Sequence, residues 1–222
     1  MKPPAGAETA VPLAKPRLRG VFHEWCFYAA IPLGVAFGLA AETTRGRIAA
    51  SVFAAAVVAM FGASALYHRV TWNASLRPWL RRLDHAGVFG LIAGTYTPFG
   101  LLVLRGAWRI SILAVVWSGV LAAILLRFLW VNAPKWLAAL IGIALGWVGV
   151  IVYPQILART GLTASLLVLA GGLSYTLGAI VYALRKPNPH PAIFGYHELF
   201  HALVVAAVCC QYAAVAFFVV PS

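Results

Sequence analysis

Long apolar stretches separated by short polar gaps run from about residue 25 to the end of the chain. A bilayer core of roughly 30 Å is crossed by about 20 residues of α-helix. Lipid offers backbone amides no hydrogen-bonding partners, which excludes open sheets. The pattern therefore predicts an all-α, polytopic membrane protein, a bundle of seven transmembrane helices at about 25–41, 48–67, 86–104, 110–127, 136–154, 163–184 and 199–220.

The composition also indicates a membrane protein. Of the 222 residues, 63% are hydrophobic and only 10% are charged, whereas soluble domains carry about 25% charged residues. The formal net charge is +12, but the basic residues occupy short gaps between apolar stretches. Membrane topology therefore explains them better than a nucleic-acid partner does. We expect membrane lipids as partners, and the plasma membrane, here a bacterial inner membrane, as the location.

The Lys and Arg residues predict the orientation of the bundle. Residues 1–21 are expected to form a disordered cytoplasmic tail, and residues 22–222 the seven-helix domain. If the N-terminus is cytoplasmic, five basic residues fall outside: Arg45, Arg47, Arg105, Arg109 and Arg159. The other twelve of the 17 fall inside. This asymmetry favours a cytoplasmic N-terminus and an external C-terminus.

Two histidines open the last apolar stretch, in GYHELFHALVV at 195–205. Residues four apart on a helix share one face, so His197 and His201 have the spacing of a metal chelate. In the predicted topology, His68 at the end of the second stretch and Asp84 before the third lie at the same depth, near the cytoplasmic face. Ionisable residues at this depth are costly and usually mark function.

His68 is the best third ligand for a zinc ion held by the two later histidines. Three imidazoles leave the fourth tetrahedral position to water, as in catalytic rather than closed structural zinc sites. Ser64, four residues before His68, is expected to hydrogen-bond that water. Asp84 is expected to orient the water or accept its proton. Acyl-bond hydrolysis, with Ser64 and Asp84 as catalytic residues, is the natural chemistry of such a site.

Simpler interpretations exist for several polar residues. Asp84 could pair with a neighbouring arginine, and Ser64 could only help helices to pack closely. Glu198 faces away from its histidine neighbours, and we expect a solvated interfacial charge rather than a peptidase base. Isolated histidines at helix ends are typical of interfacial anchors, which is the expectation for His23, His85 and His190.

Four segments give the chain a specific resemblance: SALYHR at 64–69, RRLDHAGVFGLIAGTYTPF at 81–99, AGGLSYTLGAIVYALRKP at 170–187 and FGYHELFHALVV at 194–205. In order and spacing they resemble the hemolysin III family, within the wider group of progestin and adipoQ (adiponectin) receptors. The resemblance covers residues 22–220. It implies seven helices and a cytoplasmic-side zinc on His68, His197 and His201, with Ser64 and Asp84 beside it. It also implies ceramidase-like hydrolysis of lipid amides, or haemolytic activity.

Three hypotheses on function stay open at this point. The main one is a membrane zinc protein that hydrolyses lipid amide or ester bonds near the cytoplasmic leaflet. The second is a non-enzymatic hemolysin or sensor of membrane state, in which zinc only fastens two helices together. The third is an intramembrane metalloprotease of the HExxH type, with Glu198 as base and Asp84 as third ligand. That hypothesis leaves Ser64 and His68 unexplained.

Overall fold

The helices of the protein follow the apolar stretches of its sequence. The computed structural model describes residues 15–130 and 133–220, and within them it contains α-helices and no β-strand. The α-helices are α1 (Val21–Ala40), α2 (Thr44–Arg69), α3 (Arg77–Pro98), α4 (Ala107–Leu129), α5 (Lys135–Trp147), α6 (Tyr153–Leu184) and α7 (Tyr196–Ala214). Short segments of π- or 3₁₀-helix extend them at η1 (Phe99–Val103), η2 (Val148–Val152) and η3 (Val215–Val219).

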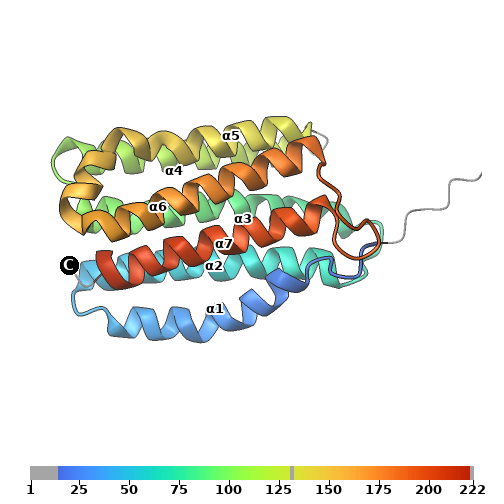
Figure 1. Cartoon of the computed structure of the whole chain (residues 1–222), viewed down its shortest axis with the longest axis horizontal. Coiled ribbons are helices and arrows are strands. Elements are labelled where there is room, and N and C mark those ends of the chain that lie inside the picture. Colours follow the sequence, from blue (N-terminus) through green and yellow to red (C-terminus); the bar gives the residue numbers. More distant parts are fainter. Residues whose placement is uncertain (1–14, 131–132, 221–222) are drawn as a thin grey trace, which may run out of the picture.

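Within the described residues, six helical stretches are long and apolar enough to cross a membrane. The longest, Lys135–Leu184, covers 50 residues and joins α5 to α6. At Gly161 the backbone leaves the helical region, with φ 78° and ψ 176°, a conformation that favours glycine. The chain turns back on itself, and Trp147 Nε1 donates to Thr176 Oγ1 at 2.9 Å. The stretch therefore folds as two helices side by side (Figure 1).

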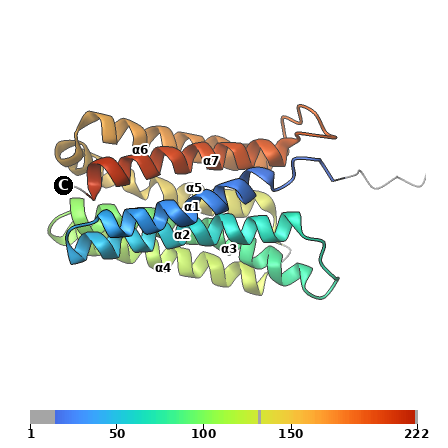
Figure 2. The same ribbon diagram turned by 90° about the horizontal axis from the view of Figure 1, so that it is seen from below.

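The helices run alongside one another down the long axis of the bundle (Figure 1 and Figure 2). α2 packs between α1 and α3, and α6 packs against α5 and α7. Small residues allow close approach: a Cβ at Gly94 of α3 would lie 2.3 Å from Ala56 Cβ of α2. Many large apolar side chains remain exposed, among them Leu39, Ile110 and Leu129. Such a surface suits lipid as its solvent, which makes this an all-α, multi-pass membrane protein.

One end of the bundle gathers the polar residues of interest. α2 ends there, and α1, α3 and α7 begin there, whereas η3 ends at the opposite end (Figure 1). α3 begins at Arg77, with a proline in its first turn, where proline is favoured. Asp84 therefore lies two turns inside α3, rather than opening the helix as the hydrophobic pattern suggests.

Residues 15–20 pack against the connection between α6 and α7. Arg17 N donates to Ala192 O at 3.1 Å, and Leu18 N donates to Ile193 O at 3.2 Å. This segment belongs to the tail expected to be disordered through residue 21, but backbone hydrogen bonds hold it in place. The rest of that expected tail, residues 1–14, lies outside the described residues.

Candidate metal centre

Three histidines from two helices converge at this end of the bundle. His68 lies in the last turn of α2, and His197 and His201 lie in the first and second turns of α7. One nitrogen from each ring can be chosen so that all three lie within 4.8 Å of one another. His68 Nε2 and His197 Nε2 are 3.2 Å apart. The structure thus brings together the three side chains that the sequence analysis selects as ligands.

Glu198 fixes the beginning of α7, between the two histidines. Its Oε2 accepts a hydrogen bond from Gly195 N at 2.9 Å, as the glutamate of a capping box does. Its Oε1 forms an ion pair with Arg19, just before α1. The side chain is 0% exposed. The expectation of a solvated charge is therefore wrong, because an arginine and a backbone amide replace water around this carboxylate.

Asp84 of α3 lies beside the histidines. Its Oδ2 is 3.6 Å from His68 Nε2, and its side chain is buried. A histidine of the cluster is therefore the neighbour of this carboxyl group. The contact also ties α3 to the junction of α2 and α7.

Ser64 lies one turn before His68 on α2 and is also buried. Its Oγ is hydrogen-bonded to His23 Nδ1 of α1 at 2.8 Å. The ring of His23 stacks on His201, with centroids 3.8 Å apart and planes 9° apart. His23 is only 2% exposed, so the expectation of an interfacial anchor is wrong. The expected first span, 25–41, begins after His23, and no second histidine at helical spacing marks it as part of a site.

The other two histidines differ from each other. His85 is partly buried, with Nδ1 2.7 Å from Arg127 Nη2 and Nε2 3.4 Å from Tyr182 Oη. These contacts turn its ring toward α4 and α6, so it too is no simple interfacial anchor. His190, in the connection between α6 and α7, is exposed. Neither ring belongs to the group that converges on one point.

The segment before α1 covers the histidines from outside the bundle. The Lys15 ammonium donates to the His68 carbonyl oxygen. Partial burial, followed by the nearby charge of Arg19, lowers the pKa of Lys15. Gly20, with φ +80°, lies against His68: a Cβ there would be 2.6 Å from His68 Cβ. The chain therefore needs glycine at this position, both for its backbone conformation and for its approach to a candidate ligand.

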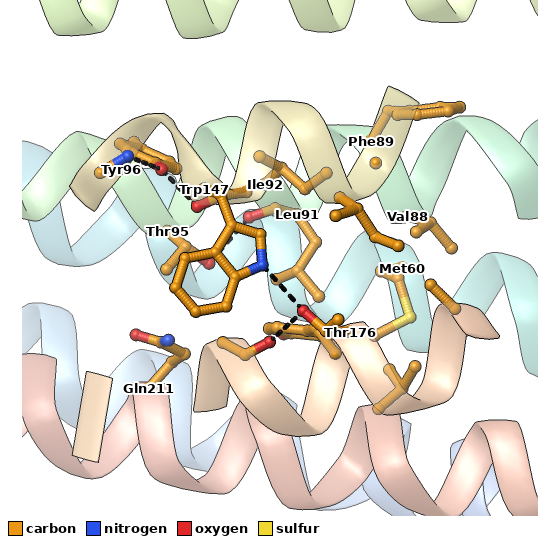
Figure 3. Close-up of a pocket in the computed structure, with 18 of the residues that line it drawn as sticks. Met60, Val88, Phe89, Leu91, Ile92, Thr95, Tyr96, Trp147, Thr176 and Gln211 are labelled. Atoms are coloured by element: carbon orange, nitrogen blue, oxygen red, sulfur yellow. Dashed lines mark hydrogen bonds between the residues drawn. The ribbon is translucent and has the colours of Figure 1, made fainter. Parts of the chain in front are cut away.

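A cavity of about 230 Å³ extends from the histidines into the bundle. Its polar end includes His23, Ser64, Asp84, His197 and His201. Most of the remaining wall is apolar and comes from α3, α5, α6 and α7, with Val88, Phe89, Leu91, Ile92 and Trp147 among the residues drawn in Figure 3. An apolar space beside a few polar groups is typical of a site for a small molecule with a hydrocarbon part.

The histidines fit a metal ion chemically. Three imidazoles are a common donor set for zinc. His201 Nδ1 is buried and has no hydrogen-bond partner among the described residues, which leaves a nitrogen to be satisfied. Asp84 supplies a neighbouring negative charge that would offset that of a cation. The group could therefore hold a metal ion.

Comparison with known proteins identifies the family of the chain. The family model described as haemolysin-III related matches residues 12–212. The chain is 30% identical to the hemolysin-3 homolog of Bacillus subtilis (strain 168) over 171 residues, which are 77% of this chain and 76% of that protein. It is 29% identical to hemolysin-3 of Bacillus cereus over 181 residues, 81% and 79% of the two chains. The family model covers all three histidines, and the chain belongs to the haemolysin III family.

Proposed function

We propose that this protein is a membrane-embedded zinc hydrolase that cleaves acyl bonds of lipids. The observation that carries the proposal is a group of three converging histidines, two of which, His197 and His201, line the polar end of an apolar cavity. His68, His197 and His201 would hold the ion. Bound there, zinc would supply Lewis-acid catalysis for hydrolysis. The cavity would accept the acyl chain next to it.

Asp84 is the proposed general base. It is the one carboxylate among the described residues that line the cavity. A water molecule would attack the acyl carbon and give up a proton to Asp84. The carbon–nitrogen or carbon–oxygen bond would then break, and the proton would pass from Asp84 to the leaving amine or alcohol. The products would be a fatty acid and the deacylated head group.

Ser64 is proposed to bind the acyl oxygen. When His23 Nδ1 carries a proton and donates it to Ser64 Oγ, the serine hydroxyl is free to donate to a substrate. His23 would thus hold Ser64 in a fixed orientation without touching the substrate. This role assigns a use to a buried histidine that otherwise has only structural contacts.

The protease hypothesis finds little support in the geometry. A general base needs a free carboxylate oxygen facing the substrate. Both oxygens of Glu198 are engaged, one by Arg19 and the other by Gly195 N. The names of the relatives favour a different second candidate, a membrane-active haemolysin. In that case a metal would only fasten α2 to α7.

Hydrolysis of defined lipids by the purified, zinc-loaded protein tests the proposal. A ceramide and a matched ester lipid are supplied in liposomes, and free fatty acid is measured. Release that disappears on chelation and returns with zinc supports a zinc hydrolase. A zinc-replete protein that releases no fatty acid but still permeabilises vesicles supports the haemolysin instead.

A further inference from the structure

Two polar atoms deep in the cavity lack partners among the described residues. Gln211 of α7 is 5% exposed, and its Nε2 donates to Val168 O at 3.2 Å, but its Oε1 accepts no hydrogen bond. The hydroxyl of Tyr175, on α6, is buried and also unpartnered. Both residues line the cavity, and Figure 3 shows the Gln211 amide reaching from α7 into it. In a lipid-like interior, such groups are costly to leave unsatisfied.

Other polar groups of the same wall are satisfied within the protein. Thr95 Oγ1 donates to Leu91 O at 2.8 Å, and Tyr96 Oη donates to Gly146 O at 2.6 Å. The Trp147 indole donates to a threonine hydroxyl, as the dashed lines of Figure 3 show. Away from the histidine end of the cavity, the unpartnered atoms of Gln211 and Tyr175 therefore differ from the other polar groups of the wall. A ligand group that hydrogen-bonds to these two atoms would supply the partners that the described residues do not provide.

The packing between α6 and α7 makes room for the Gln211 amide. A Cβ at Gly171 would lie 2.7 Å from Gln211 Nε2, so glycine leaves space that alanine would take. Tyr175 follows Gly171 by one helical turn on the same face of α6. The amide and the phenol therefore belong to one region of the wall. Gln211 is ten residues beyond His201 on α7, which places it about 15 Å deeper along the helix.

We propose that Gln211 and Tyr175 form a subsite for a hydroxyl group on an acyl chain, about 15 Å from the polar head of the lipid. The hydroxyl would donate to Gln211 Oε1 and accept from the Tyr175 phenol. The ligand class is thus mid-chain hydroxylated acyl lipids. Placing the head group beside the histidines rests on the proposed function, but binding at the subsite requires no turnover.

The probes are 12-hydroxystearate and stearate, whose chains have equal length. Each competes with a fluorescent fatty acid for the protein in nanodiscs. Wild type is expected to prefer 12-hydroxystearate by about tenfold, the effect of one or two buried hydrogen bonds. Gln211→Leu should abolish the preference and raise the melting temperature of the ligand-free protein, because it removes an unsatisfied amide. Thr95→Val, which removes a hydroxyl already bonded to its own helix, should keep the preference.

Equal binding of the two probes to wild type would overturn the proposal, as would a preference that survives in both Gln211→Leu and Tyr175→Phe. Loss of the preference in Thr95→Val would also overturn it, since discrimination would then not arise from the unpartnered groups. Should Gln211→Leu fail to fold, Tyr175→Phe serves as the test. Lipid hydrolysis is measured in parallel. Hydrolysis without a binding preference contradicts the subsite alone, and a preference without hydrolysis contradicts the proposed function alone.

Discussion

Nε2 of His68 and Nε2 of His197 face each other at 3.2 Å, although 129 residues separate them in the chain. The contact joins the end of α2 to the beginning of α7. Two imidazole nitrogens this close either share one proton or bind a common cation. His201, one turn further along α7, adds a third nitrogen within 4.8 Å. The end of the bundle is therefore organised around a point where a cation would be stabilised.

Removing any one of the three histidines should remove most of the metal. His68→Ala, His197→Ala and His201→Ala are each expected to lower zinc occupancy strongly, and chelation should lower the melting temperature of wild type, because the folded state loses a ligand. Metal content by atomic spectroscopy and a thermal melt check this. His85→Ala is the control and should change neither the zinc occupancy nor the effect of chelation on the melting temperature. Equal loss in the His85 and His68 variants would mean that the ligands are assigned wrongly.

Glu198 should matter for the position of α7 rather than for chemistry. Glu198→Ala leaves Arg19 without a carboxylate and the helix without its cap, and we expect a loss of about 3 kcal/mol in unfolding free energy. Arg69→Ala breaks the more exposed pair with Glu24, whose oxygen is 2.7 Å from Arg69 Nε, and should cost about 1 kcal/mol or less. Denaturation of both variants in the same detergent makes the comparison. Similar small losses would show that Glu198 does not anchor the helix.

The role of His23 can be separated from that of the metal ligands. His23→Phe keeps an aromatic ring against His201 but removes the hydrogen bond to Ser64. Zinc content should stay unchanged, whereas lipid hydrolysis should fall by about tenfold or more. Ser64→Ala should lower hydrolysis similarly, and the double variant should be no worse than either single one, since both changes remove one interaction. Additive losses would indicate that the two residues act separately.

The bundle should have its histidine end in the cytoplasm, according to the bias of Lys and Arg. A reporter fused after Ser222 should then be external, and a reporter in the connection at 185–195 should be cytoplasmic. Enzyme reporters that are active on only one side of the membrane make the measurement. A cytoplasmic C-terminus would reverse the orientation and move the proposed site to the outer leaflet.

Much of the fold and part of the site could be predicted from sequence, since both depend on local spacing. Apolar stretches of membrane length predict the helices, and the four-residue spacing of His197 and His201 predicts their common face. His23 and the buried state of Glu198 could not be predicted in this way. Each depends on which helices become neighbours, and in particular on α1 packing near α7. The unpaired amide of Gln211 likewise appears only once α6 and α7 are packed together.

The central claim is that a carboxylate beside the histidines performs chemistry without binding the metal. The most direct test measures zinc content and fatty-acid release for Asp84→Asn and Glu198→Gln side by side. Because Asp84 is the proposed base and not a ligand, Asp84→Asn should keep its zinc and lose at least about tenfold in turnover on a ceramide-like substrate. Glu198→Gln should lose much less. Loss of zinc in Asp84→Asn, or full activity in that variant with the glutamine variant inactive, would contradict this account.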